Sequence, residues 1–218
     1  MINRFFRRIV PVALVLSAMA CTSAYADAAK RFYLAGYMGL NVFPAQEFTD
    51  SVSGTNGEIG ISNGYNFAGA IGFKLTSQLR LEGELSSMTA DFDAIDLSGI
   101  GTFGLGGDLG SKLAMVNIYY DFDLNWKKLQ PFIGAGVGYG WHDGTINDLS
   151  GFSSDISESA SGFAWQVGGG LKYNVADDMA LIGAYRYLDG QDLEFGGYDI
   201  DFGTHEIRFG LSWDLPFE

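Results

Sequence analysis

The closing stretch of the chain, Thr204 to Phe217, has a strict two-residue period. Apolar side chains occupy every second position, at Ile207, Phe209, Leu211, Trp213, Leu215 and Phe217. The positions between them hold Glu206, Arg208, Gly210, Ser212 and Asp214. This period indicates a β-strand with one apolar and one polar face. Such a strand either covers a soluble core with its apolar face or turns that face toward lipid in a membrane barrel.

The first 26 residues have the pattern of a secretory signal peptide. Arg4, Arg7 and Arg8 precede an uncharged stretch over residues 9–26, which ends in Ala24-Tyr25-Ala26. A basic start, an apolar middle and a small-residue cleavage site predict export and removal of this segment. The alternative, a membrane-spanning helix, is disfavoured because the apolar stretch is short and interrupted by polar residues.

Residues 27–218 are predicted to form a single domain. The one cysteine, Cys21, precedes the expected cleavage site, so no disulfide would support the exported fold. A faint lipobox before Cys21 leaves a lipid-anchored N-terminus as an alternative. Cleavage would remove three arginines and no acid, so 13 Lys and Arg become 10 against 26 Asp and Glu. Such an acidic chain is not expected to bind nucleic acid, which requires basic patches.

Seven other stretches alternate as the closing one does. In chain order the eight predicted strands are Arg31–Val42, Asn66–Leu75, Leu79–Thr89, Lys112–Phe122, Gln130–Trp141, Gly162–Asn174, Met179–Leu188 and Thr204–Phe217. The connections between them are alternately long and short, and no mature stretch has the ~18 apolar residues of a membrane helix. The pattern predicts an all-β fold, an eight-stranded antiparallel up-and-down transmembrane β-barrel with short periplasmic turns and four long extracellular loops.

The polar faces of these strands carry nine charged residues, which we expect to form a lumen charge network. They are Lys74, Arg80, Glu82, Glu84, Asp121, Lys172, Arg186, Glu206 and Arg208. Five cations face four anions, which suits mutual pairing in a closed lumen because unpaired buried charge is costly. A soluble eight-stranded calyx, the alternative, would need an apolar interior.

Glycines and aromatic residues add two expectations. Gly134, Gly136, Gly138 and Gly140 share one face of a predicted strand, so bulky lumen side chains should lie opposite them. Several aromatic residues lie near strand ends, where girdles form at the membrane interfaces. The girdle candidates are Tyr37, Trp126, Tyr139, Trp141, Trp165, Tyr173, Tyr185, Tyr187 and Trp213.

Several motifs follow one another along the mature chain, at residues 79–85, 117–122, 130–139 and 185–187, before the aromatic C-terminal strand. In order and spacing they resemble the small outer-membrane β-barrel proteins of the OmpA-type and opacity-protein class. The resemblance implies the outer membrane of a Gram-negative bacterium. It also implies insertion by the barrel-assembly machinery through a C-terminal signal, here Trp213, Leu215 and Phe217. Glu218 after that aromatic end departs from the family pattern.

The resemblance further implies a non-enzymatic envelope or surface-interaction role of the adhesion type, carried by the acidic extracellular loops. The expected partners are outer-membrane lipid, lipopolysaccharide and host surface molecules, with no cofactor and no metal. The acidic loops could in principle hold divalent cations, but Asp91, Asp93 and Asp96 lack the spacing of an EF-hand. We therefore expect a solvated acidic surface there.

Two other functions stay open at this stage. The first is a narrow porin-like channel, although eight strands enclose a lumen barely wide enough for its own side chains. The second is a lipid-A-modifying or proteolytic enzyme that uses a histidine at the outer rim, His142 or His205. Such a site is defined by the geometry of its residues, which the sequence does not supply. Interfacial or loop histidines are the simpler interpretation.

Overall fold

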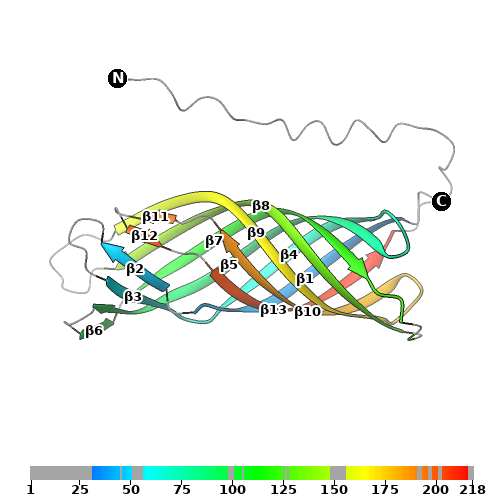
Figure 1. Cartoon of the computed structure of the whole chain (residues 1–218), viewed down its shortest axis with the longest axis horizontal. Helices are drawn as coiled ribbons and strands as arrows, with labels where there is room; N and C mark the ends of the chain where they lie inside the picture. Colours follow the sequence, from blue (N-terminus) through cyan, green and yellow to red (C-terminus); the bar gives the residue numbers. More distant parts are fainter. Residues whose placement is uncertain are drawn as a thin grey trace, which may run out of the picture.

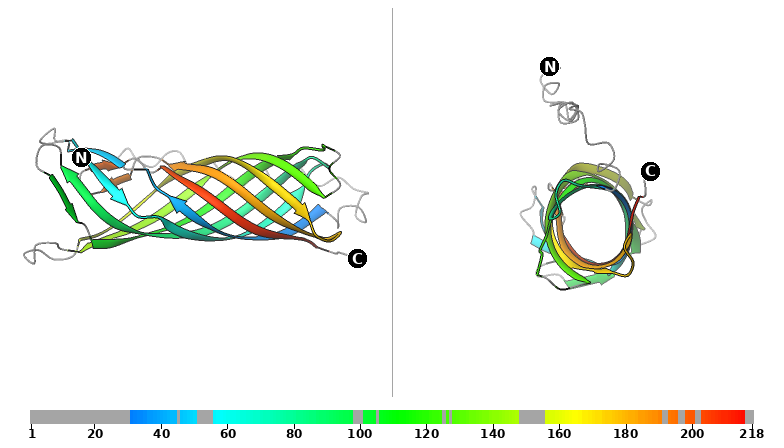
Figure 2. Two further views of the ribbon diagram at one scale, coloured as in Figure 1. Left: turned by 90° about the horizontal axis from the view of Figure 1, so that it is seen from below. Right: turned by 90° about the vertical axis from the view of Figure 1, so that its right-hand side faces the viewer.

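Eight strands close into one antiparallel barrel, which Figure 2 shows as a ring when viewed along its axis. The computed structural model describes residues 31–44, 46–50, 56–97, 101–104, 106–124, 126, 128–147, 156–190, 193–195, 198–200 and 203–215. The barrel strands are β1 (Phe32–Val42), β4 (Gly64–Lys74), β5 (Leu79–Leu97), β7 (Gly106–Asp121), β8 (Leu129–Asn147), β9 (Ile156–Asn174), β10 (Met179–Gly190) and β13 (Gly203–Asp214). Their order is β5-β4-β1-β13-β10-β9-β8-β7, and β7 pairs with β5 to close the ring. The predicted fold class is confirmed.

The first and last barrel strands pair with each other. β1 and β13 run antiparallel from Tyr33 opposite Asp214 to Val42 opposite His205. β13 ends at Asp214, and the backbone N–H of Leu215 still donates to the carbonyl of Phe32 at 2.9 Å. The predicted insertion signal extends to Phe217, which lies outside the described residues, as does the predicted signal peptide.

The two ends of the barrel differ. At one end the strands are joined by short turns, such as the one from Leu75 to Gln78, in which the Thr76 hydroxyl accepts the backbone N–H of Leu79 at 2.9 Å. At the other end lie the short strands β2, β3, β6, β11 and β12 (Figure 1). Because short turns face the periplasm in such barrels, the end with these short strands is the extracellular end.

The barrel wall continues farther on the extracellular side than the sequence predicts. β5 and β7 stay paired as far as Asp91 opposite Asp108, and β7 and β8 as far as Gly106 opposite Asn147. The added strands are β2 (Gln46–Asp50), β3 (Asn56–Ile61), β6 (Gly101–Gly104), β11 (Leu193–Phe195) and β12 (Tyr198–Ile200). They extend the sheet from β5 through β3, β2 and β12 to β11. The predicted long loops are therefore partly β-structure.

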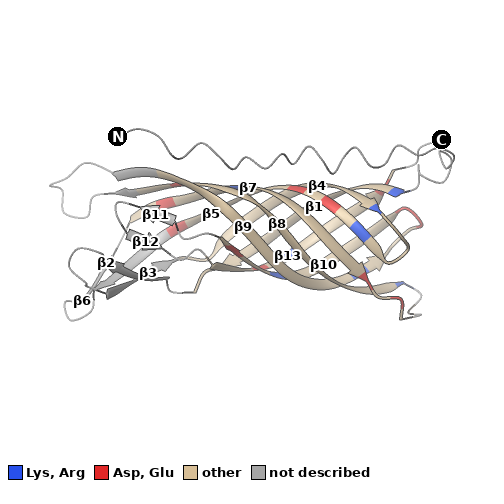
Figure 3. Cartoon of the chain, turned by 45° about the horizontal axis from the view of Figure 1, so that its top comes forward, with Lys and Arg blue, Asp and Glu red and all other residues tan. Residues whose placement is uncertain are grey.

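The outward face of the barrel is apolar and exposed, whereas the inward face buries charge. Leu85 is 69% exposed and Phe209 is 65% exposed, while Glu82 and Glu206 are fully buried. In Figure 3 most positions along the barrel strands are neither acidic nor basic. This arrangement is the inverse of a soluble calyx and fits a lipid-facing wall. Among the described residues, no helix has the length and hydropathy of a membrane span.

Most of the girdle candidates lie on the exposed surface. Trp126, Trp141, Trp165 and Trp213 are between 38% and 55% exposed, and the Trp213 indole donates a hydrogen bond to Asp178 Oδ2 at 3.0 Å. Tyr37 was assigned wrongly, because it is 9% exposed and points into the lumen. The first strand has aromatic residues on both faces, so aromatic character alone could not distinguish them.

Candidate functional site

Glu84 is the centre of the polar network that fills the lumen. Its Oε1 accepts a hydrogen bond from Arg186 Nη1 at 2.9 Å, and its Oε2 accepts one from Arg208 Nη1 at 3.1 Å. Arg186 Nε also donates to Glu206 Oε2 at 2.5 Å, and Arg208 Nε lies 4.0 Å from the same oxygen. Arg186 and Glu206 are direct cross-strand partners on β10 and β13, whereas Glu84 reaches across the lumen from β5. Two guanidiniums thus share two carboxylates, and this layer carries no net charge.

Glu82 is the acceptor of the next layer toward the periplasm. Its Oε2 accepts hydrogen bonds from the hydroxyl of Tyr33 at 2.8 Å and from that of Tyr37 at 3.1 Å. Arg80 Nη1 lies 3.4 Å from the same oxygen and donates to the Tyr33 oxygen at 2.9 Å. A buried carboxylate needs hydrogen-bond donors in place of water. Two phenols and one guanidinium supply them to Glu82.

Asp121 closes the network at the periplasmic end of the lumen. Arg80 Nε donates to its Oδ1 at 3.2 Å, and Lys172 Nζ donates to its Oδ2 at 3.3 Å. The Arg80 guanidinium also lies 4.0 Å from the ring centre of Tyr119 and 4.9 Å from that of Phe132. Arg80 is thus held by carboxylates on two sides and by aromatic rings, a set of contacts that its planar, delocalised charge favours.

Uncharged amides connect the layers, and the sequence did not single them out. Asn117 Nδ2 donates to Glu84 Oε2 at 3.4 Å, and Arg186 Nη1 donates to Gln166 Oε1 at 2.5 Å. The Gln166 amide in turn donates to Asn117 Oδ1. A Cβ on Gly136 would overlap that Asn117 oxygen, so the glycine leaves room for the network as its position on the strand predicts. The alternation of the sequence predicts that these amides face the lumen, but it does not predict their hydrogen-bond partners.

The structure places eight of the nine predicted network residues inside the lumen. The ninth, Lys74, is the last residue of β4 and lies half-exposed at the periplasmic mouth. Its Nζ is 2.5 Å from Asp214 Oδ2, an acceptor that the sequence reasoning did not include. Within the lumen four cations therefore meet four carboxylates.

The extracellular half of the lumen holds no ion pair among the described residues, and much of it is apolar, although buried polar residues such as Asn41, Ser111 and His142 also face it. A cluster of buried side chains fills it, formed by Phe43, Met88, Ala90, Leu109, Leu113, Met115, Ala164 and Leu188. Alternation had predicted a polar lumen, but above Glu84 the inward positions of β5 and β7 hold mainly methionine, leucine and alanine. Two spaces of about 30 Å³ lie lower in the barrel, one inside the lumen and one at the periplasmic mouth, each with room for roughly one or two water molecules.

The two histidines lie on opposite faces of the barrel wall. His142 is 4% exposed, faces the lumen and lies 2.7 Å from the buried Ser111 hydroxyl through its Nδ1. His205 faces outward, with its Nδ1 2.6 Å from the Tyr185 hydroxyl and its ring 5.1 Å from that of Tyr187. They do not form one site, and both members of the Ser111–His142 pair are buried on the lumen side of the wall.

A metal site was not expected from the spacing of acids and histidines. Within the described ranges, no group of three or more His, Cys, Asp or Glu side chains is placed to hold a metal ion. Most of the acidic loop residues singled out in the sequence, including Asp93 and Asp96, have side chains outside the described part. In the described lumen, the cations and carboxylates contact one another, and Arg80, Arg186 and Arg208 line a space of about 30 Å³.

Comparison with known proteins agrees with this architecture. A family model described as outer membrane protein beta-barrel domain matches residues 12–214. The chain is 27% identical over 197 residues to outer membrane protein PagN of Salmonella typhimurium strain LT2, covering 80% of this chain and 81% of PagN. Two solved structures share the fold. OprG from Pseudomonas aeruginosa has a TM-score of 0.55 at 14% identity, with 85% of this chain and 96% of OprG covered.

The second structure is Neisserial surface protein A (NspA). It has a TM-score of 0.52 at 16% identity, with 84% of this chain and 97% of NspA covered. At such low identity these two likenesses show the fold alone. The family model, in contrast, spans most of the chain, including every barrel strand. The chain therefore belongs to the outer membrane protein beta-barrel domain family and is a protein of the Gram-negative outer membrane.

Proposed function

We propose that this protein is a non-enzymatic outer-membrane anchor whose extracellular segments bind other surfaces, as in adhesion to host cells. The observation that carries the proposal is the contrast between the two halves of the molecule. The lumen is filled by the Glu84 network and by the apolar cluster above it. The wall meanwhile continues beyond the membrane and carries the strands β2, β3, β6, β11 and β12. A filled interior leaves the extracellular end as the part that meets partners.

The extracellular segments are acidic, and this charge sets the kind of partner. Acids of these segments are Glu47, Asp50, Glu58, Asp91, Asp93, Asp96, Asp108, Asp143, Asp148, Asp155, Glu158, Asp192, Glu194, Asp199 and Asp201. A surface of one sign raises the rate of encounter with surfaces of the opposite sign and is screened by salt. We therefore expect a partner with a basic patch and an interaction that weakens as ionic strength rises.

Replacement of the extracellular segments one at a time tests the proposal. Residues 191–202 would be replaced by a short Gly-Ser turn, and the other three segments likewise, in a Gram-negative host that does not adhere by itself. We expect at least one replacement to lower adhesion to epithelial monolayers to the level of empty cells, while the amount of barrel in the outer membrane stays constant.

Charge variants show whether acidity is responsible. Neutralisation of Asp192, Glu194, Asp199 and Asp201 by the matching amides should lower adhesion at low salt more than at high salt. The matched control is Asp177→Asn, because Asp177 is exposed in the turn before β10 at the periplasmic end. Adhesion that survives all four segment replacements would sink the proposal.

A further inference from the structure

Lys112 is a cation on the lipid-facing side of the barrel wall. Among the described residues, two basic side chains are exposed, those of Lys112 and Lys128. Lys112 lies on the barrel wall, whereas Lys128 lies in a short turn at the periplasmic end. The cross-strand neighbours of Lys112 are Ser87 on β5 and Trp141 on β8, both exposed. In the part of the chain that the structure describes, the Lys112 ammonium has no ion pair or hydrogen bond. A lone cation on an apolar wall calls for an anionic partner.

The aromatic neighbours of Lys112 place it at the extracellular membrane interface. Trp141 packs edge-on against Tyr139 with ring centres 5.2 Å apart, and the Tyr139 hydroxyl lies 3.1 Å from Ser161 Oγ. Tryptophan and tyrosine with polar partners of this kind collect at the headgroup level. Lys112 also lies near the start of β7, which descends from the extracellular end. The ammonium is therefore level with the headgroups of the outer leaflet.

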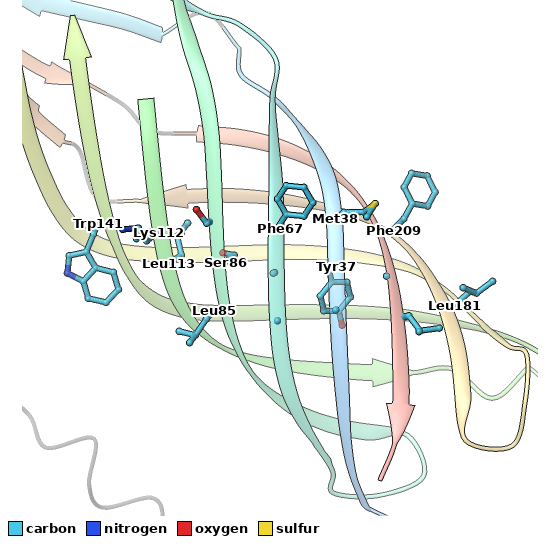
Figure 4. A pocket seen from close by; sticks show the side chains of 16 residues that line it. Tyr37, Met38, Phe67, Leu85, Ser86, Lys112, Leu113, Trp141, Leu181 and Phe209 are labelled. Atoms are coloured by element: carbon cyan, nitrogen blue, oxygen red, sulfur yellow. The ribbon is translucent and has the colours of Figure 1, made fainter. Parts of the chain in front are cut away.

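A groove runs from Lys112 across the apolar wall. Gly36 and Gly69 lie opposite each other on β1 and β4 and give it a floor without side chains. The groove has a volume of about 900 Å³. Figure 4 shows Trp141 and Lys112 at one end, with Phe209 and Leu181 toward the other. Because this second end lies farther from the extracellular strands, the groove leads from the headgroup level toward the hydrocarbon.

We propose that the groove binds one molecule of lipid A, the acylated and phosphorylated anchor of lipopolysaccharide, which forms the outer leaflet of this membrane. A phosphate accepts charge-assisted hydrogen bonds from the Lys112 ammonium, with the Ser87 hydroxyl and the Trp141 indole beside it. One acyl chain lies over Gly36 and Gly69, where the absent side chains allow close contact with the backbone. The site concerns the wall within the membrane, so it goes beyond the adhesion role and does not depend on it.

Two acids just above the site decide how direct the contact is. Asp143 lies opposite Gly110, two residues along β7 from Lys112, and Asp108 lies two residues farther. Both side chains are exposed. A carboxylate repels a phosphate that contacts Lys112 directly, but it strengthens binding if a divalent cation bridges the two anions. The direct contact proposed here therefore predicts that Asp143→Asn binds lipid A as tightly as the unmodified protein, or more tightly.

Binding by the full-length refolded protein in detergent micelles tests the site. The probes are bisphosphorylated lipid A, its dephosphorylated form and dioleoyl phosphatidylglycerol. We expect Lys112→Gln to weaken the binding of bisphosphorylated lipid A about tenfold, as hydrogen bonds to charged groups do, and to leave the dephosphorylated form unaffected. Lys128→Gln removes the same charge at the periplasmic end and should change neither.

The groove itself is tested by filling it. A Cβ on Gly36 or Gly69 would meet no atom within 4 Å, so Gly69→Leu should fold and should weaken both forms of lipid A. Gly183 also has open space outside its Cα but is absent from the groove, which makes Gly183→Leu the matched control. Unchanged heat-dependent gel mobility shows that each variant forms the barrel.

Four binding results would overturn the proposal. They are full binding by Lys112→Gln, an equal loss with the dephosphorylated probe, equal affinity for phosphatidylglycerol, and weaker binding by Asp143→Asn. A dimer that forms without lipid and is broken by Gly69→Leu but not by Gly183→Leu would also overturn it, because the groove would then hold a second copy of the chain.

Discussion

At the residue scale, Glu84 determines whether the lumen charges are balanced. It accepts from both Arg186 and Arg208, and no other carboxylate contacts both within 3.5 Å among the described residues. Each of these charges has left water, and the cost of that transfer is recovered only while the partners stay in place. We therefore expect the loss of one member of the network to lower the stability of the protein much more than a substitution at an exposed position does.

The substitution Glu84→Ala tests this sensitivity. It leaves two buried guanidiniums to share Glu206, and breaking a buried pair in this way should lower the free energy of unfolding by about 3–5 kcal/mol. Urea unfolding of the refolded protein in lipid vesicles measures the change. The control Asp177→Asn, at an exposed turn residue, should stay within about 0.5 kcal/mol of the unmodified protein. Equal midpoints for the two variants would show that the lumen pairs contribute nothing.

The charged members of the network could be predicted from alternation, but their partners could not. A two-residue period states which face Arg208 is on, yet its contact with Glu84 joins residues 124 positions apart across the lumen. The position of Tyr37 was also ambiguous from the sequence. A tyrosine suits the membrane interface, but it can equally face the lumen, where Tyr37 donates a hydrogen bond to Glu82. The closure of the barrel determines both the partner of Arg208 and the environment of Tyr37, and closure depends on the whole sheet.

At the scale of the element, each barrel strand is a two-sided ribbon whose apolar side faces lipid. Val116 lies near the middle of the membrane part of β7, outward and 53% exposed, opposite Val137 of β8. Val175 is 42% exposed in a periplasmic turn. The two valines have similar exposure but different surroundings, and only the membrane distinguishes them.

A charge scan at these two valines tests the orientation of the wall. Val116→Arg should lower the free energy of unfolding in lipid vesicles by about 2–4 kcal/mol, because a guanidinium near the bilayer midplane is poorly solvated. Val175→Arg should cost about 0–1 kcal/mol, the value for the interface. Similar costs at both positions, measured by urea titration, would mean that β7 does not cross the hydrocarbon as described.

The number and order of the strands could be predicted because each one repeats the same simple pattern. Their extracellular ends could not, since Ala90 and Leu109 continue the buried face into a stretch whose glycines and aspartates indicated a loop. Backbone pairing between β5 and β7 extends farther along these strands than their apolar outward face does. Outside the membrane a strand needs only its hydrogen-bonding neighbour and an inward core, so outward polarity does not mark its end.

At the scale of the whole molecule, the barrel is a closed and filled cylinder with an acidic extracellular end. Its lumen holds paired charge below and the apolar cluster above. Two spaces of about 30 Å³, one in the lower lumen and one at the periplasmic mouth, are too small for a hydrated ion. An eight-stranded barrel encloses little more than its own side chains. We therefore propose that the barrel serves as an anchor and that binding takes place on the surfaces outside it.

Single-channel recording of the refolded protein in planar bilayers shows whether the lumen is filled. We expect a steady baseline without conductance steps, because an ion would have to displace both the Glu84 network and the apolar cluster above it. Heat-dependent gel mobility confirms beforehand that the sample is folded. Reproducible steps that disappear when Arg80 or Glu84 is neutralised would contradict the filled lumen and would favour the narrow channel.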